Sequence, residues 1–469
     1  MATTVTLKPN AIDLSGSTSG TTTLQATAVA GTTTITLPAA TDTLVGKATT
    51  DTLTNKTLTA PVISTISNTG TITLPTSTDT LVGRATTDTL TNKTLTSPTL
   101  TTPALGTPAS GILTSCTGVN YDGYKNRIIN GAMVIDQRNA GASVSVSSGT
   151  SGYTADRWFY EYAGSATGVT VQQVTDAPTG FSNSIKITIG TGASVAAGNY
   201  LDFEQKIEGF NTIDFAFGTA SASTITLSFW VKSSITGTYS VCLQNASAGA
   251  TRGYTTTYTI SAANTWEQKS ITVAGDTSGT WVGASNACSL NIVLFAGAGS
   301  SYQTSTLNSW RSGGFAIANT VTNTIISTSG ATIQWTGVQL EKGSTATSFD
   351  YRPYGTELSL CQRYYYQTWG FGSFANNGAG YAGQVLPAAN NASSYGSASF
   401  PVSMRAAPTV TTYDSTGSSG NVSQPAIANG LAATAGNISI GGFYNVTKSS
   451  TTFTVGTPVA CQFTASIEL

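Results

Sequence analysis

A 37-residue repeat near the N-terminus constrains this chain more than any other feature of its sequence. Residues 34–61 read TITLPAATDTLVGKATTDTLTNKTLTAP and residues 71–98 read TITLPTSTDTLVGRATTDTLTNKTLTSP, with 24 of 28 positions identical. Near-identity at a fixed period predicts a repeat architecture, in which each unit buries its apolar face only against neighbouring units.

The repeat carries too little apolar surface to fold as a single copy. No Phe, Tyr or Trp precedes Tyr121, and Thr fills 34 of the first 100 positions. A buried aliphatic side chain contributes about 2 kcal/mol, whereas ordering each backbone residue costs about 1–2 kcal/mol. The 37 residues from position 34 to 70 contain nine large aliphatics: Ile35, Leu37, Leu44, Val45, Leu53, Leu58, Val62, Ile63 and Ile66. The segment therefore needs parallel copies of itself, which predicts a homo-oligomeric fibre.

Composition excludes several classes of function. Charged residues make up only 9% of the chain and the net charge is -1, so there is no basic surface for nucleic acid. No apolar run is long enough to predict membrane insertion. The start, MATTVTLKPN, lacks a secretory signal pattern, so we expect the chain to be made and folded in a cytoplasm. The five scattered cysteines are predicted to be reduced and mostly buried.

The residues after position 120 predict an all-β protein, because Gly, Ser and Thr accompany many β-branched residues. Strand-like runs separated by turn signals predict a β-sandwich of jelly-roll type, and they lie at 169–174, 184–189, 224–231, 266–273, 290–295 and 331–340. A short helical turn is expected near 356–363, leading into a Tyr-rich strand. Further strands are predicted at 397–402, 409–413, 452–455 and 461–469.

Shifts in composition predict four regions. Residues 1–30 are expected to form an N-terminal attachment segment, and residues 31–117 a Thr-rich repeat shaft that ends in regularly spaced prolines. Residues 118–356 should form the central β-sandwich. Residues 357–469 should form a C-terminal β domain at the distal tip.

Catalytic chemistry is nearly absent from the sequence. The chain has no histidine, which removes Ser-His-Asp and Cys-His catalysis and histidine-based metal sites. We therefore predict no enzyme activity, no catalytic residues, no metal and no cofactor. The remaining enzymatic alternative is glycan cleavage by a carboxylate pair. Asp202 and Glu204 are the best local pair, since alternate strand residues share one face, although adjacent Lys206 suits a charged, exposed strand face instead.

A second charged motif has two interpretations. Asp156 and Arg157 stand directly before Trp158. They could form a ligand site, but an Arg–Asp pair that holds a core tryptophan is the favoured interpretation.

Aromatic side chains give the stronger binding signal. Six of them fall between Tyr364 and Phe374, and about two-thirds of that cluster should be core. Other tyrosines stand among Gly, Asn and Ser, a composition typical of adaptable binding loops. Aromatic rings stack on sugars while amides and hydroxyls bind their oxygens, so the candidate glycan-binding residues are Trp369, Tyr381, Tyr395, Tyr413 and Tyr444.

Several segments resemble tailed-bacteriophage tail-fibre proteins. ATTDTLTNKTLTSPTL and GTTTLQATAVAGTTTITLPAATDTLVG are similar to shaft repeats of that family. NRIINGAMVIDQRNAG (126–141) and YTADRW (153–158) resemble the domain that follows such shafts. GVQLEKGSTATSFDYRPYGTELSLCQRYYYQ (337–367) and FPVSMRAAPTVT (400–411) are likewise similar to phage and prophage tail-fibre sequences. LSFWVKSS (227–234), TWEQKSITV (265–273) and the GVQLEKG strand look like β-sandwich carbohydrate-binding modules.

The resemblance implies a receptor-binding protein of the virion, assembled in the host bacterial cytoplasm. It implies a homotrimer that contacts phage tail or baseplate proteins through its N-terminus. Its distal domains would bind a host surface polysaccharide or lipopolysaccharide without chemistry, and three tips would raise avidity by about 10²–10⁴. The alternatives are a tailspike-like depolymerase that uses Asp/Glu pairs and a purely structural virion or baseplate fibre. A bacterial surface adhesin fits less well, because no export signal is visible.

Overall fold

The computed structural model describes two separate parts of the chain. The described residues are 5–8, 11–15, 19–25, 125–245, 252–321, 324–372, 384–387, 392–425, 427–449 and 453–469, with isolated positions 57, 59, 62, 94, 96 and 390. Contacts divide the chain into two compact units, Met1–Gly111 and Ile112–Leu469. Among the described residues, no helix is both long and apolar enough to cross a membrane.

The first unit contains a three-stranded antiparallel sheet. Its strands are β1 (Val5–Lys8), β2 (Ala11–Ser15) and β3 (Thr21–Gln25), in that order. The alternation of Thr with aliphatic residues in the first block therefore does form strands here. Almost all of the predicted shaft, residues 31–117, lies outside the described residues, so its repeats and the oligomer they imply stay predictions.

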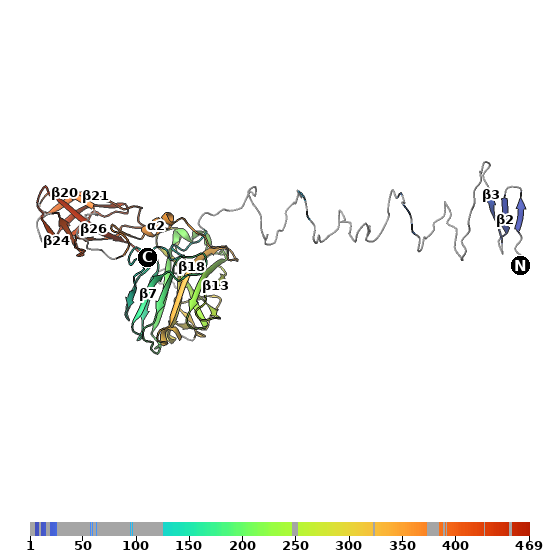
Figure 1. The fold of residues 1–469 in the computed structure, drawn as a ribbon, viewed down its shortest axis with the longest axis horizontal. Coiled ribbons are helices and arrows are strands. Elements are labelled where there is room, and N and C mark those ends of the chain that lie inside the picture. The colour runs from blue at the N-terminus through green and yellow to red at the C-terminus, as the bar shows by residue number, and fades with distance from the viewer. Residues whose placement is uncertain are drawn as a thin grey trace. The chain divides into compact units, whose positions relative to one another are not determined.

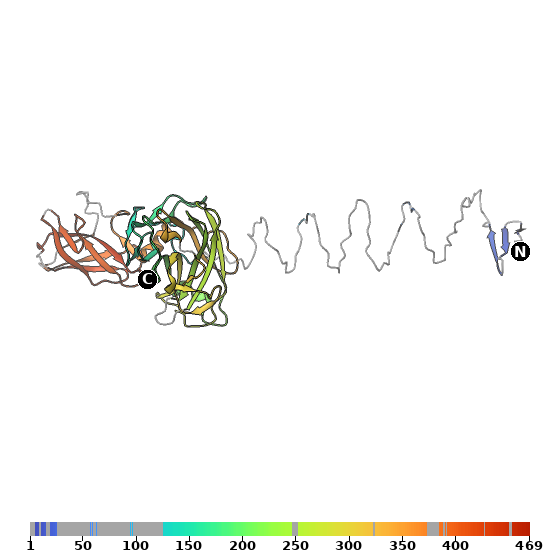
Figure 2. The ribbon, with the colours of Figure 1, turned by 90° about the horizontal axis from the view of Figure 1, so that it is seen from below.

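The second unit begins with a sandwich of two antiparallel sheets, in which Figure 1 labels β7, β13 and β18 of one sheet. The six-stranded sheet has the order β13 (Glu267–Val273), β10 (Ile225–Ser233), β18 (Thr332–Lys342), β8 (Ser184–Thr188), β7 (Val169–Val174) and β4 (Val144–Val146). The seven-stranded sheet has the order β16 (Trp310–Ser312), β12 (Arg252–Ile260), β11 (Gly237–Asn245), β14 (Cys288–Ala298), β9 (Tyr200–Glu208), β6 (Phe159–Ala163) and β5 (Thr150–Tyr153). Figure 2 shows how strongly the green and yellow strands curve.

The predicted sandwich strands are confirmed: all six runs lie on β7, β8, β10, β13, β14 and β18. Short connecting elements are η1 (Gly209–Asn211), η2 (Ile213–Phe215), η3 (Ser300–Tyr302), β15 (Gln303–Thr304), β17 (Ile317–Ala318) and α1 (Thr324–Ser327). The sequence analysis did not predict β11 or β12, and of β9 it predicted only that Asp202 and Glu204 alternate on one face of a strand.

Three stacked rings form the centre of the sandwich core. Trp158 lies parallel to Phe203 of β9, with ring centroids 5.0 Å apart, and Phe203 lies parallel to Trp335 of β18 at 6.1 Å. All three side chains are fully buried. Since Phe203 and Trp335 belong to different sheets, the stack joins the two layers and contributes beyond its buried area, typically about 0.5–1.5 kcal/mol per pair.

The motif at residues 126–141 folds as a loop packed against β18. The Asn126 amide donates to the Val338 carbonyl at 3.1 Å, and the Asn130 amide donates to the carbonyls of Ile135 and Asp156 at 2.8 and 2.9 Å. A Cβ on Gly131 would lie 2.2 Å from the Val338 carbonyl oxygen, so only glycine fits. These residues have a packing role.

Helix α2 (Tyr354–Gln362) leads into an eight-stranded C-terminal sheet, which Figure 2 shows in red. Its strands are β19 (Tyr365–Gln367), β20 (Gln384–Pro387), β21 (Ser393–Ser399), β22 (Thr409–Tyr413), β23 (Asn421–Gln424), β24 (Ala428–Gly436), β25 (Gly442–Lys448) and β26 (Pro458–Ser466). The helical turn, the Tyr-rich strand and the strand at 409–413 are confirmed.

Other C-terminal strand predictions are shifted or wrong. Strand β26 begins three residues earlier than the predicted 461–469 and ends before the terminus. The run predicted at 397–402 overlaps only the end of β21. In the predicted strand 452–455 the described residues form no strand, and Phe453 is buried in the C-terminal core instead. The aromatic Phe453 belongs to the core, whereas Val455 is exposed, so this apolar pair did not indicate the backbone conformation.

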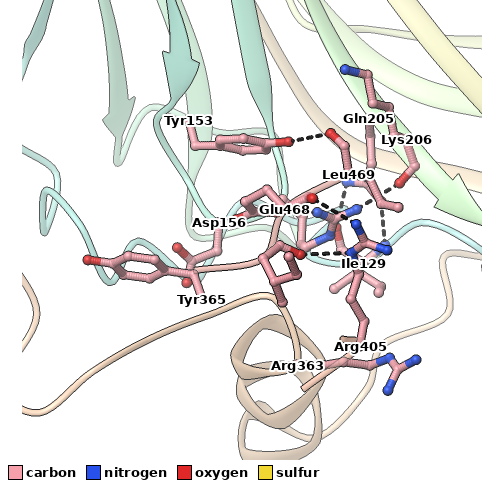
Figure 3. Close-up of polar contacts among 12 residues, drawn as sticks. Ile129, Tyr153, Asp156, Gln205, Lys206, Arg363, Tyr365, Arg405, Glu468 and Leu469 are labelled. Atoms are coloured by element: carbon pink, nitrogen blue, oxygen red, sulfur yellow. Dashed lines mark hydrogen bonds and ion pairs between the residues drawn. The ribbon is translucent and has the colours of Figure 1, made fainter. Parts of the chain in front are cut away.

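The end of the chain is held by a network of charges, shown in Figure 3. Arg157 forms an ion pair with Glu468, and Arg138 bridges Glu468 at 2.7 Å and Asp156 at 2.9 Å. The Tyr153 hydroxyl donates to the backbone oxygen of Leu469 at 3.0 Å. The network ties the segment after β26 to the sandwich.

This network corrects one detail of the sequence interpretation. Trp158 is a core residue, as favoured, but the cation beside Asp156 is Arg138 and not Arg157. Arg157 has a positive φ of 72°, which turns its side chain away from its neighbour and over the Tyr364 ring, 3.6 Å from the centroid. Local sequence adjacency therefore did not predict the pairing.

The network predicts that Glu468→Gln destabilises the protein. The Arg157 side chain is 1% exposed, so removing its partner leaves an unpaired buried cation and should cost about 3–5 kcal/mol. The control Glu267→Gln breaks a more exposed ion pair to Lys269 and should cost at most about 1 kcal/mol. Denaturant unfolding measures both, and equal losses would contradict the structural role of Glu468.

Candidate functional site

The structure brings the predicted glycan-binding aromatics together as two pairs. Trp369 lies against Tyr413 of β22 with ring centroids 5.2 Å apart, and Tyr395 of β21 lies 6.0 Å from Tyr444 of β25. Tyr381 lies outside the described residues.

The two pairs differ in exposure. Tyr395 and Tyr444 are 39% and 52% exposed, so both rings remain accessible to a ligand. Trp369 and Tyr413 are half-buried, and the Trp369 indole donates to the Gly372 carbonyl at 3.0 Å. Within the predicted cluster Tyr364 is buried and Tyr366 packs against Phe463, so much of that cluster is structural, as expected. The exposed pair is the better candidate for stacking on a sugar.

A second candidate, absent from the sequence predictions, is an open recess on the outer face of the seven-stranded sheet. Its volume is about 330 Å³. Aromatic and polar side chains from five segments line it: Glu161, Tyr200, Glu204, Lys206, Gln244, Asn291, Tyr302 and Phe315. Aromatic surface with a few convergent polar groups is the usual composition of a small-molecule site.

The alternation of β9 positions the polar side of the recess. Leu201, Phe203 and Ile207 point into the sandwich core, so the intervening Asp202, Glu204 and Lys206 project to the outer face. Neighbouring strands continue the polar rows, because Glu161 of β6 pairs with Asp202. On the other side Asn291 of β14 pairs with Lys206, and Gln244 of β11 pairs with Asn291.

The aromatic side of the recess comes from the segment that follows β14. Residues 299–321 fold back over the outer face and bury an apolar cluster with Val293 and Phe295. Tyr302 and Phe315 of this segment pack edge-on at 5.4 Å, and each also meets Tyr200 of β9. The segment therefore covers one part of the outer face and leaves the neighbouring part open.

Two carboxylates meet at the base of this face. The Asn291 amide donates to Glu204 at 2.5 Å, and the Lys206 ammonium lies 3.2 Å from the other Glu204 oxygen. Asp202 is fully buried, and neither carboxyl oxygen has a hydrogen-bond partner of normal geometry. Burial raises the Asp202 pKa well above its usual value, and the charges of Glu204 and Glu161 raise it further, although the Glu161 backbone lowers it slightly.

The positions of Asp202 and Glu204 bear on the alternative function, which is glycan cleavage by a pair of carboxylates. Asp202 and Glu204 do share one face, as alternate strand positions should, but they are buried rather than on an exposed charged face. Asp202 does not line the recess, and Glu204 is already occupied by Asn291 and Lys206. Among the described residues, no group of three or more Cys, Asp or Glu side chains is placed to hold a metal ion.

Comparisons with solved structures find distant likenesses to the β-sandwich. One is the enzymatically active domain of a tailspike protein of bacteriophage CBA120. It is 15% identical to this chain over 47% of this chain and 22% of that chain, with a TM-score of 0.27. A putative sugar binding protein from Bacteroides thetaiotaomicron is 12% identical over 46% of this chain and 100% of its own, with a TM-score of 0.26. A family 11 carbohydrate-binding module from Clostridium thermocellum, in complex with a mixed-linked tetrasaccharide, is 12% identical over 44% and 100%, with a TM-score of 0.22.

These likenesses concern the fold alone. The chain spans about a fifth of the tailspike structure, 22% of its length. No protein-family model and no curated protein matches the sequence. The candidate sites are therefore argued from their own residues.

The sequence of β9 indicates the polar part of the recess. Tyr200, Asp202, Glu204 and Lys206 alternate with apolar residues, which is the pattern of a half-buried strand. Tyr302 and Phe315 gave no comparable signal, because no local period indicates that their segment returns to β9.

The raised pKa of Asp202 predicts a stability that falls with increasing pH. The folded protein holds this proton above the unfolded-state pKa of about 3.9, so stability declines as pH rises through the folded pKa. Asp202→Asn should remove that decline and raise the free energy of unfolding at pH 8 by about 1–3 kcal/mol.

Asp414→Asn provides a control of opposite sign. Burial raises the Asp414 pKa, but hydrogen bonds from Thr416, Ser418 and Gly430 outweigh it and lower the pKa overall. Loss of the Asp414 carboxylate in Asp414→Asn should therefore destabilise the protein at neutral pH. Thermal unfolding at pH 5 and pH 8 measures both variants, and a destabilised Asp202→Asn protein at pH 8 would contradict the assignment.

Proposed function

We propose that this chain binds a glycan without chemistry, through the recess on the outer face of the seven-stranded sheet. The observation that carries the proposal is the composition of that recess. Tyr200, Tyr302 and Phe315 supply aromatic surface, while Glu204, Lys206 and Asn291 supply charged and polar groups on the same wall. Sugars present both an apolar ring face and many hydroxyls, and a site of this kind complements both.

The exposed pair of Tyr395 and Tyr444 on the C-terminal sheet supports a second contact with the same class of ligand. Their rings stand 44° apart and are flanked by Asn445, whose amide is already bonded to Thr447 at 2.9 Å. Tyrosines supply rigid contact area at low entropic cost. Two weak sites on one chain would raise the apparent affinity for a long polysaccharide.

The biological setting of the proposal is a bacteriophage tail fibre that recognises its host. Its support is the sequence resemblance of residues 126–141, 337–367 and 400–411 and the repeats that need parallel copies. In this setting the chain is a homotrimer attached to the virion through its N-terminus. A surface polysaccharide or lipopolysaccharide of the host is its receptor.

One observation favours a second candidate, carboxylate-driven glycan cleavage. Asp202 has a strongly raised pKa beside Glu204, and two carboxyl groups with different environments are the usual acid and base of glycosidases. Burial of Asp202 away from the recess opposes it. Release of oligosaccharide or loss of polysaccharide viscosity with the purified full chain would establish cleavage and overturn the non-catalytic proposal.

A glycan screen with the full-length protein tests the binding proposal. For a glycan that binds, Tyr302→Ala should weaken the affinity at least about tenfold, as truncating a central aromatic anchor typically does. Isothermal titration calorimetry measures the dissociation constant. Unchanged affinity in Tyr302→Ala would remove the recess from the binding site.

Tyr444→Ala tests the C-terminal pair separately. It should weaken binding of a long polysaccharide several-fold, while binding of a short oligosaccharide to the recess stays unchanged. Tyr354→Ala is the matched control, since Tyr354 is 55% exposed and Tyr444 is 52% exposed. Equal effects of both variants would contradict a specific role of Tyr444.

A further inference from the structure

The charge balance of the recess is negative. Glu161 and Glu204 line it, and Lys206 is its only lining cation. The Lys206 ammonium is committed to Glu204 at 3.2 Å and lies 4.8 Å from the centre of the Phe159 ring. Lys206 therefore offsets one carboxylate and leaves Glu161 without an ion pair of its own among the described residues.

Arg311 of β16 does not change this balance. Its charge reaches Cys242 on the neighbouring part of the outer face. It does not shift the pKa of Glu161, on which the charges of Glu204 and Lys206 act, and its guanidinium donates to the carbonyls of Gly313 and Gly314 at 2.7 and 2.6 Å. Burial raises the pKa of Glu161, and the neighbouring Glu204 raises it further, which agrees with an excess of negative charge.

Unpaired acceptors lie in and beneath the same recess. Asn291 lines the recess and is 2% exposed, yet its side-chain oxygen has no hydrogen-bond partner. Both oxygens of buried Asp202 are also unpaired. Every other buried side-chain atom without a partner in the described residues is a guanidinium nitrogen or a hydroxyl. Because the raised pKa of Asp202 keeps a proton on its carboxyl group, the Asn291 oxygen of β14 is the one unpaired buried oxygen of the described residues that cannot donate.

A ligand that fits this wall must supply donors and positive charge. The ionised Glu161 carboxylate accepts hydrogen bonds and donates none, so a ligand that brings donors complements it. A hydroxyl brings one donor and no charge, whereas an ammonium brings three donors and a charge that strengthens each bond to a carboxylate. An anionic sugar would instead meet like charge at Glu161 and Glu204.

We propose that the recess binds its glycan through a sugar that carries a free amino group, with Glu161 facing the ammonium. This inference rests on the proposed function and names the class of glycan for that site. Glu161 is then the residue that determines specificity for the amino group, while the aromatic side chains contact the sugar ring.

The test compares two oligosaccharides that share one backbone. The full-length protein is titrated with a fully deacetylated glucosamine hexamer and with the fully acetylated hexamer, at a pH where the amine is protonated. The deacetylated form should bind at least about tenfold more tightly, which is the effect of one charge-assisted hydrogen bond. Its affinity should fall as salt rises from about 0.05 to 0.5 M, because salt screens the charge.

Glu161→Gln should abolish the preference for the deacetylated hexamer, so that the two hexamers bind with similar affinity. Glu267→Gln is the matched control, since it removes a carboxylate from β13 of the other sheet. Binding should also be unaffected by a metal chelator. Circular dichroism spectra of each variant confirm that the fold is retained.

The outcomes separate this inference from the proposed function. Each of four outcomes would overturn the inference and leave glycan binding intact. They are equal binding of the two hexamers, tighter binding of the acetylated hexamer, loss of binding with the chelator, and an unchanged preference in Glu161→Gln. Binding of neither hexamer would also overturn it. The proposed function itself fails if the glycan screen and competition for adsorption to host cells are both negative.

Discussion

The strand β9 is the constraint on which the sandwich and its recess both depend. Successive side chains of β9 point to opposite faces of the sheet, so Phe203 enters the aromatic stack between the sheets while Asp202 and Glu204 lie on the opposite face. A register shift of one residue would exchange the two faces, so the core and the polar wall are specified together. Asp202 is fully buried whereas Glu204 lines the recess, so two similar carboxyl groups on one strand have different surroundings.

The parts of the chain that resemble tail-fibre sequences have mainly packing roles in this structure. Asn126 and Asn130 hold a loop against β18 and the sandwich core. Glu468 is an anchor for Arg138 and Arg157, while Arg405 donates to the backbone oxygens of Ile467 and Glu468. Figure 3 shows the Tyr153 hydroxyl bonded to Leu469 beside Glu468 at the end of the chain. The candidate binding residues lie elsewhere, on surfaces where the fold leaves aromatic and polar side chains accessible.

Prediction from sequence succeeded where a local period was strong. The runs at 169–174 and 409–413 coincide with β7 and β22, because alternation reports directly on a half-buried strand. It failed at 452–455, where Phe453 enters the core from a non-strand segment. It also misassigned the partner of Asp156, since the left-handed backbone at Arg157 turns that side chain elsewhere. The predicted tyrosines Tyr395 and Tyr444 are neighbours only because β21 and β25 pair.

The sequence by itself determined the β character of the chain after residue 120 and the lack of histidine chemistry. Only the tertiary structure decided which residues share a site. Glu161, Asn291 and Tyr302 are far apart in the sequence and meet through antiparallel register and a segment that folds back over the sheet. Such contacts depend on long-range pairing and burial, and no local sequence period records them.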